Sequence, residues 1–180
     1  MIFHETALSG AFLIDLEPHV DTRGFFARSF CSGEFAAHGL ASVFVQSNIS
    51  FNAERGTLRG MHWQTAPHAE AKLVRCTAGS LWDVIVDLRP GSPTRLVWAG
   101  FELDARRRRL LYVPEGFAHG FITLESATEV FYEMSAPYVA DASRGFRWDD
   151  PGIGIVWPLP PQRISDQDAG LQCLSSETKP

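Results

Sequence analysis

The sequence is poor in cysteine and contains no long apolar run. Its three cysteines, Cys31, Cys76 and Cys173, are too few and too scattered for a disulfide framework or a zinc cluster. No stretch approaches the length of a membrane span, and the first ten residues lack the basic and apolar segments of a signal peptide. We therefore expect a protein of a reducing compartment, by default the cytoplasm, with no membrane partner.

An excess of positive charge is also absent. The chain has 16 lysines and arginines against 21 aspartates and glutamates, which gives a formal net charge of -5 at pH 7. Nucleic acids and anionic membranes bind through a basic field, so neither is an expected partner. A local cationic pocket remains compatible with this balance. The four consecutive arginines at 106–109 would point both ways on a strand, which favours a solvated edge or turn over a phosphate site.

Signals for helices are weak, whereas signals for strands recur along the 180 residues. Turn sequences such as Pro114-Glu115-Gly116 separate short apolar or alternating runs, a pattern typical of all-β sandwiches and barrels. We expect one domain, residues 1–180, in which about 165–180 form a C-terminal segment whose last ten residues are a loose tail. A short peripheral helix is expected from a cap at Ser32 to Gly39. The expected strands are 11–16, 25–30, 42–50, 57–64, 71–76, 80–88, 95–103, 109–114, 118–124 and 128–134.

The sequence RGMHWQTAPHAEAK, residues 59–72, places three chemically active side chains close together. They are the guanidinium of Arg59, the imidazole of His62 and the ammonium of Lys72. A proline in the middle predicts strand, turn and strand. Side chains alternate between the faces of a strand, so Arg59 and His62 would point to opposite sides unless Gly60 forms a bulge. Unpaired charge is costly in an apolar sheet, so these groups indicate a functional site.

Two tyrosines and an aspartate each have a structural and a functional interpretation. Tyr132 shares a strand face with Val130 and Met134, which predicts an inward side chain. It is either a core tyrosine whose hydroxyl finds a partner or a proton donor. Tyr138 follows a proline in a predicted loop and could present its ring for stacking. Asp168, near the C-terminus, could fold back to orient a histidine.

Several other polar residues have similar alternatives. Gln46 and Asn48 share a strand face, which suits hydrogen bonds to a hydroxylated ligand but equally a solvated sheet. Arg23 precedes an aromatic pair and is either a turn residue or an anion contact. Asp83 and Asp87 share a face of the strand at 80–88. We expect them to be structural, with pairing of Asp83 to a histidine or lysine of the site as the alternative.

Residues 114–120, PEGFAHG, have the spacing P-x-G-x-x-H and resemble the second motif of the cupin superfamily, which are small double-sheet jelly-roll barrels. The region around His62 resembles the first motif. Metal-binding cupins carry a second histidine where this chain has Gln64, and a histidine or asparagine where it has Thr123. A divalent site of this type needs three or four ligands, and His62 with His119 supplies two. We therefore expect no metal.

Together these segments resemble the dTDP-4-dehydrorhamnose 3,5-epimerase family, whose members epimerise a nucleotide-linked 4-keto-6-deoxy sugar. The matching segments follow the family's order and cover nearly the whole chain. They are DTRGFF (21–26), VQSNIS (45–50), GTLRGMHWQ (56–64), AKLVRCTAGSLWDVIVDLRPGSPT (71–94), YVPEGFAHGF (112–121), FYEMSAPY (131–138) and WDDPGIGIVWP (148–158).

The resemblance implies an all-β cupin-type jelly roll with short peripheral helices. It also implies a homodimeric epimerase without metal or cofactor, whose expected substrate is dTDP-4-keto-6-deoxyglucose. By the same resemblance His62 is the general base, paired with Asp168, and Lys72 faces the keto oxygen. Tyr132 matches the family's acid, and Tyr138 matches the aromatic residue that stacks on thymine. The other substrate contacts carried over are Arg23, Gln46, Asn48, Arg59 and His119.

Four places depart from the family pattern. Arg28 stands where a typical member has glutamate, Glu70 where it has glutamine, and Gln167 where it has lysine. The fourth is the family's SPTFG, which here reads SPTRL (92–96). These departures change charge near the substrate and leave the base, acid and lysine untouched. Whether C3, C5 or both carbons are inverted, and which nucleotide base is bound, therefore stays open.

The chemistry of such a reaction accounts for these residue types. Removing a proton beside a ketone gives an enolate, and a fixed cation beside its oxygen stabilises it by about 3–4 kcal/mol. Histidine titrates near neutrality, and inversion needs a second proton donor on the opposite face of the sugar. Two other functions compete with this one: a metal-dependent cupin oxygenase or isomerase, and a non-catalytic sugar-nucleotide-binding cupin.

Overall fold

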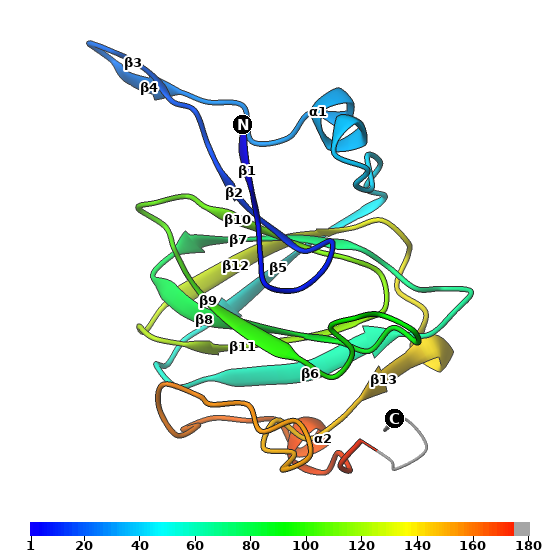
Figure 1. Ribbon diagram of the computed structural model, residues 1–180. Helices are drawn as coiled ribbons and strands as arrows, with labels where there is room; N and C mark the ends of the chain where they lie inside the picture. Colours follow the sequence, from blue (N-terminus) through cyan, green and yellow to red (C-terminus); the bar gives the residue numbers. More distant parts are fainter. Residues whose placement is uncertain (175–180) are drawn as a thin grey trace.

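The computed structural model, which describes residues 1–174, consists of two antiparallel sheets that face each other (Figure 1). The first sheet has six strands, in the order β1 (Ile2–Glu5), β2 (Phe12–Asp15), β10 (Leu110–Val113), β7 (Lys72–Ala78), β12 (Thr128–Met134) and β5 (Gln46–Asn52). The second has five, in the order β13 (Ser143–Gly145), β6 (Leu58–Gln64), β11 (Phe117–Thr123), β8 (Ser80–Asp87) and β9 (Trp98–Asp104). The all-β prediction is confirmed.

The remaining elements are small and peripheral. A hairpin of β3 (His19–Asp21) and β4 (Gly24–Phe26) projects from the outer side of the six-stranded sheet (Figure 1). The helices are α1 (Ser32–Ala37), the 3-10 helix η1 (Ala140–Ala142) and α2 (Asp166–Ala169). None of the helices in the described part of the chain is long and apolar enough to cross a membrane.

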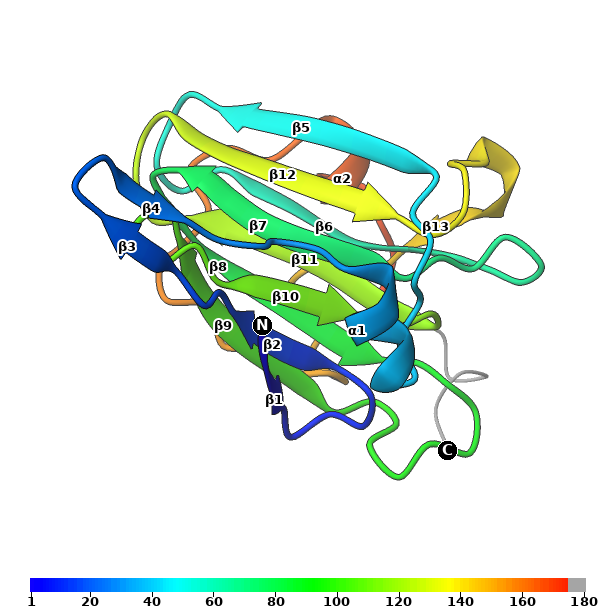
Figure 2. The ribbon, with the colours of Figure 1, turned by 90° about the horizontal axis from the view of Figure 1, so that it is seen from above.

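Alternating apolar side chains from both sheets fill the space between them. Val74 on β7, Ile85 on β8 and Leu111 on β10 are fully buried members of this core. A second cluster, centred on Phe35, lies where α1 covers the six-stranded sheet, and a third, around Phe146, packs against the five-stranded sheet. Burying each such side chain stabilises the fold by about 1.5–3 kcal/mol. A cavity lies between the two sheets near β5, β12 and β6. Figure 2 shows these strands from above.

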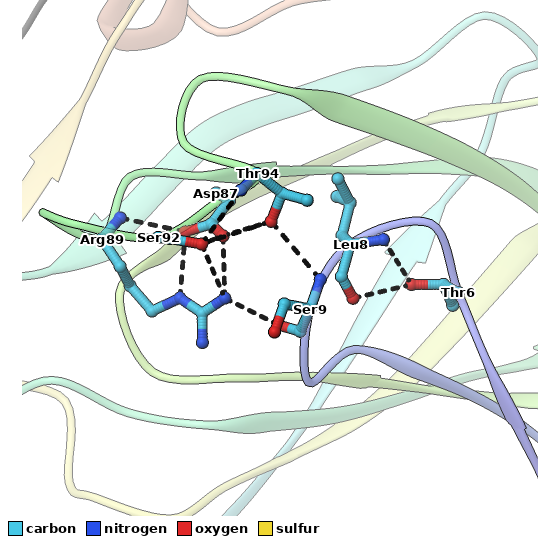
Figure 3. Close-up of polar contacts among 7 residues, drawn as sticks. All are labelled: Thr6, Leu8, Ser9, Asp87, Arg89, Ser92 and Thr94. Carbon is cyan, nitrogen blue, oxygen red and sulfur yellow. Dashed lines mark hydrogen bonds and ion pairs between the residues drawn. The ribbon is translucent and has the colours of Figure 1, made fainter. Parts of the chain in front are cut away.

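The loop between β8 and β9 is organised around the buried carboxylate of Asp87 (Figure 3). Arg89 donates to it through Nε (3.0 Å) and NH2 (2.7 Å), and the hydroxyls of Ser92 (2.5 Å) and Thr94 (2.7 Å) donate as well. Arg89 NH2 also donates to the Ser9 carbonyl (2.7 Å), which ties the β1–β2 loop to this one. Burial would raise the pKa of Asp87, but the donors outweigh it and lower the pKa to about 2. The expected structural role of Asp87 agrees with these contacts.

Some expected boundaries are wrong. The expected strand at 25–30 ends at Phe26, the one at 42–50 begins only at Gln46, and the short strands β1, β3 and β13 were not expected. Helix α1 is capped by Cys31 without a side-chain bond, so the proposed Ser32 cap is wrong. The C-terminal segment is held further than expected, because Leu174 is buried and its N–H donates to Asp150 (2.6 Å). The rest of the expected tail, 175–180, lies outside the described residues.

Candidate active site

A cavity of about 590 Å³ opens between the two sheets and is lined by polar side chains from both. Most of the predicted site residues line it: Arg59, His62, Lys72, His119, Tyr132, Tyr138 and Asp168. The five-stranded sheet supplies Arg59, His62 and His119, whereas the six-stranded sheet supplies Lys72 and Tyr132. Proposed base and proposed acid therefore lie on opposite walls of one cavity.

A bulge in β6 brings Arg59 and His62 to the same wall. His62 pairs with His119 and Arg59 with Phe121, so three steps along β6 match two along β11. Gly60 occupies the bulge with φ +128°, and a Cβ there would lie 2.5 Å from the Cα of Gly120. Only glycine adopts this conformation and tolerates this contact. The predicted bulge is confirmed.

His62 and Asp168 form a hydrogen-bonded pair. The His62 Nε2 lies 2.7 Å from Oδ1 of Asp168, and the N–H of Gly60 donates to its Oδ2 (3.2 Å). Asp168 is placed by α2, whose N-cap Ser165 accepts a hydrogen bond from the Asp168 N–H (3.1 Å). Burial would raise the pKa of Asp168, but the bonds and charge of His62 outweigh it and lower that pKa. An ionised Asp168 holds the proton on Nε2 and leaves Nδ1 as the acceptor.

Lys72 is paired with a carboxylate that the sequence indicated only as a departure from the family. The Lys72 ammonium contacts Oε1 of Glu70, and both side chains are buried. The second oxygen of Glu70, Oε2, has no hydrogen-bond partner in the described part of the protein. The cavity wall therefore contains an ion pair whose carboxylate is only half satisfied.

A second histidine–aspartate pair stands beside the first. His119 Nε2 lies 2.9 Å from Oδ2 of Asp83, and the aspartate is completely buried. Burial raises the pKa of Asp83, although the charges of His119 and Lys72 oppose that shift. His119 is the cross-strand neighbour of His62, so the two imidazoles lie side by side. The alternative interpretation of Asp83, pairing with a site histidine, is the one observed.

Tyr132 enters the cavity from β12 and is half-buried. Burial raises the pKa of its phenol, the charge of Arg59 lowers it, and the charge of Glu70 raises it again, with a net upward shift. The hydroxyl is therefore protonated at neutral pH and able to donate a proton.

At the mouth of the cavity, Arg59 is exposed and its Nε donates to the Asn52 side chain (2.9 Å). Tyr138 lies in the loop after β12 and is 57% exposed. Gln46 and Asn48 bond to each other (3.1 Å) on β5 beside Met134, a residue that lines the cavity, and are not among the lining residues themselves.

Arg23 is not brought to the cavity of its own chain. It lies in the projecting β3–β4 hairpin, its side chain is 88% exposed, and its guanidinium pairs with Asp21. Ser165 was not predicted and Gln167 was noted only as a departure from the family, yet both line the cavity beside Asp168. Only the position of α2 against β6 brings these two residues to the site.

The residues at the two positions where a metal-binding cupin carries further ligands are engaged elsewhere. Gln64 bonds through its amide to the backbone of two loops, and the Thr123 hydroxyl donates to the Glu54 carbonyl (2.9 Å). Within residues 1–174, no three histidine, cysteine, aspartate or glutamate side chains are grouped as ligands of one metal ion.

Comparison with known proteins gives consistent matches. A family model described as dTDP-4-dehydrorhamnose 3,5-epimerase matches residues 5–176. An enzyme of that name from Sinorhizobium fredii is 45% identical over 97% of this chain and 90% of its own length, and one from Shigella flexneri is 44% identical over 87% of each.

Solved structures agree with the sequence matches. The dTDP-4-dehydrorhamnose 3,5-epimerase of Bacillus anthracis, with TDP and PPi bound, superposes with a TM-score of 0.92 at 42% identity, covering 96% of this chain and 99% of that one. A Legionella pneumophila 3,5-epimerase in complex with dTDP-4-keto-L-rhamnose gives a TM-score of 0.89 at 32% identity, covering 98% and 96%. These neighbours are cupin jelly rolls, which confirms the predicted fold.

Proposed function

The chain belongs to the dTDP-4-dehydrorhamnose 3,5-epimerase family, and from that premise we propose how its residues carry out the reaction. It is an epimerase of dTDP-linked 4-keto-6-deoxyhexoses in the biosynthesis of dTDP-rhamnose. The position of His62 and Tyr132 on opposite walls of one cavity supports their roles as base and acid. A sugar ring between the two sheets would present one face to each residue.

His62 is the base that removes the proton beside the ketone. Its Nε2 is engaged by Asp168, so the lone pair of Nδ1 takes the proton. Asp168 fixes the tautomer and stabilises the imidazolium that forms, as the aspartate does in a Ser-His-Asp triad. The lowered pKa of Asp168 keeps this carboxylate ionised at neutral pH.

Lys72 meets the charge that develops on the keto oxygen as the enolate forms. Its ammonium is buried, and a fixed cation is most effective where water is excluded. Tyr132 then returns a proton from the other wall, which inverts the carbon. The raised pKa of its phenol keeps that proton in place until the enolate takes it.

The nucleotide end of the substrate lies toward the mouth of the cavity. Arg59 provides a forked donor for the diphosphate, and Tyr138 offers an exposed ring on which the base stacks. His119, held by Asp83, contacts the sugar beside His62. Gln46 and Asn48 act from β5, beside Met134.

The active form is a homodimer, and Arg23 acts in the cavity of the second copy. Exposed apolar residues support this assembly, with Ile49 and Phe51 on β5 and Val20, Phe25 and Phe26 on the hairpin. Arg23 lies away from its own cavity on this projecting hairpin. A contact between Arg23 and substrate therefore requires a partner chain.

Solvent deuterium separates the base from the acid. The substrate dTDP-4-keto-6-deoxyglucose is incubated in D₂O with each variant, and exchange and configuration are followed by NMR. With His62→Ala no enolate forms, so no deuterium enters the sugar. With Tyr132→Phe the enolate forms and His62 returns a deuteron to the original face, which gives exchange without inversion. If Tyr132→Phe, correctly folded, abolishes both or inverts at the parental rate, the two-wall assignment is wrong.

A further inference from the structure

Gln64 is a buried amide whose hydrogen bonds all hold backbone in two loops. It lies two residues after His62 at the end of β6 and is 4% exposed. Its Nε2 donates to the carbonyls of His68 (3.0 Å) and Pro137 (3.2 Å), and its Oε1 accepts from the N–H of Val139 (2.6 Å). Gln64 therefore forms hydrogen bonds with the peptide groups on both sides of Tyr138.

The side-chain amide of Gln46 also holds the backbone at Tyr138. The N–H of Tyr138 donates to Oε1 of Gln46 (3.0 Å), which comes from β5 in the other sheet. The ring of Tyr138 is 57% exposed, and its hydroxyl makes no hydrogen bond within the described residues. Gln64 and Gln46 thus hold the backbone from which the ring projects.

Only a carboxamide can make this set of bonds at position 64. The site needs a donor for two carbonyls and an acceptor for an N–H, and an amide carries both on one short group. A carboxylate would keep the bond to Val139 and lose both bonds to carbonyls. An apolar side chain would remove these bonds from three partly buried backbone groups, which is costly.

We propose that Gln64 is a positioning residue for nucleotide binding, which acts by holding the Tyr138 ring where the base stacks. This rests on the proposed function, in which Tyr138 stacks on the base. A ring held in one orientation loses little conformational freedom on binding, whereas a loose ring must be ordered each time. Gln64 occupies the position of a metal ligand in metal-binding cupins, and in this chain it serves the nucleotide end of the substrate.

Nucleotide affinity provides the test, with dTDP alone as the probe and isothermal titration calorimetry as the measurement. The set is the parent, Tyr138→Ala, Gln64→Met and the double variant. Base–aromatic stacking corresponds to roughly 5- to 150-fold in affinity, so Tyr138→Ala should weaken dTDP binding within that range. Gln64→Met should weaken it about 5-fold or more. The double variant should bind no more weakly than Tyr138→Ala, because Gln64 acts only through that ring.

Two further measurements distinguish positioning from general damage. With Gln64→Met the Michaelis constant should rise, while turnover at saturating substrate stays within about 2-fold of the parent, since the enolate chemistry lies at the other end of the cavity. Gln172→Met, at an exposed glutamine outside the cavity, is the matched control and should leave both constants unchanged. If Gln64→Met does not fold, Gln64→Asn keeps the amide on a side chain one methylene shorter and should give a loss of the same kind.

The outcomes separate the two proposals. If Tyr138→Ala weakens binding but the Gln64 variants bind like the parent, or if the losses add in the double variant, the positioning role is overturned and the stacking role stands. If Tyr138→Ala leaves dTDP affinity unchanged, both are overturned.

Discussion

Lys72 and Glu70 show how one residue's role depends on its neighbour. An ammonium buried in a cavity wall is unstable unless a counter-charge is close, and Glu70 supplies it. The same carboxylate lowers the positive potential that Lys72 offers to an enolate. Glu70 therefore stabilises the buried ammonium and at the same time weakens the stabilisation of the enolate. Removing only one member leaves the other charge buried without its partner.

Lys72→Ala should lower turnover about 100- to 1000-fold, with a smaller effect on the Michaelis constant. The lysine meets charge that exists mainly in the enolate, so its loss affects the chemical step. Steady-state kinetics on the keto sugar measure both constants. Lys72→Ala combined with Glu70→Gln is the matched control, because it removes the stranded carboxylate and shows how much of the loss came from it. A raised Michaelis constant at unchanged turnover would instead make Lys72 a simple binding residue.

Single residues of the site could be predicted where the side chain itself is chemically active and stands in an apolar strand pattern. His62 and Lys72 carry charge into an apolar strand pattern, and both line the cavity. The function of Glu70 and Gln64 depends on partners brought together by the fold, and no spacing in the sequence indicates those partners. The sequence showed that Glu70 departs from the family pattern and Gln64 from the motif of metal-binding cupins. It did not show what either residue does.

At the scale of elements, the bulge in β6 could be predicted because a glycine marks its position in the sequence. Strict alternation would have separated Arg59 from His62, and Gly60 marked the place where alternation fails. The strands expected at 25–30 and 42–50 failed for a different reason. Phe30 and Phe44 pack edge to face in the cluster under α1, and a local apolar pattern does not distinguish that packing from pairing in a sheet.

Asp87→Asn should destabilise the β8–β9 loop and the fold. The pKa of Asp87 is about 2 in the folded chain against an ordinary 3.8, which corresponds to about 2 kcal/mol. Because the pKa of Asp87 is lower in the folded than in the unfolded chain, its carboxylate stabilises the fold fully above the unfolded pKa. This stabilisation is lost as the pH falls through the folded pKa. Denaturant unfolding near pH 7 should therefore show a loss of about 2 kcal/mol that shrinks from about pH 4 down toward pH 2. Asp141→Asn, at an exposed aspartate of η1, is the control. A loss that does not vary with pH over this window would contradict the linkage.

At the scale of the whole molecule, exposed apolar residues support the proposed homodimer. Ile49, 65% exposed, lies on edge strand β5 beside Phe131 of β12, over whose ring the Arg75 guanidinium lies at 4.9 Å. Phe51 on β5 and Val20, Phe25 and Phe26 on the hairpin are exposed as well, and Ile49 and Phe51 also line the cavity. Exposed apolar patches of this kind mark interaction sites, and a two-fold contact is the commonest solution for identical chains.

Sedimentation equilibrium should therefore give twice the 20.0 kDa mass of one chain. Ile49→Lys should shift the equilibrium toward the single chain, because a dimer with a two-fold axis buries the new ammonium of both copies. Val156→Lys is the matched control, since Val156 is equally apolar and 69% exposed but belongs to the segment that packs on the other sheet. A parent that sediments at the mass of one chain would refute the assembly.

Complementation between inactive chains tests whether the dimer completes each site. Arg23→Ala should lower kcat/KM because a phosphate contact is lost, and His62→Ala should abolish turnover because the base is lost. When the two variants are mixed and allowed to exchange, about half of the dimers contain one chain of each kind. In such a dimer, the cavity of the Arg23→Ala chain retains His62 and receives Arg23 from its partner. The mixture should therefore regain about a quarter of the parental activity, since one of two cavities is complete in half of the dimers. If Arg23 served its own cavity, neither cavity of a mixed dimer would be complete, and mixing would add nothing to the residual activity of Arg23→Ala.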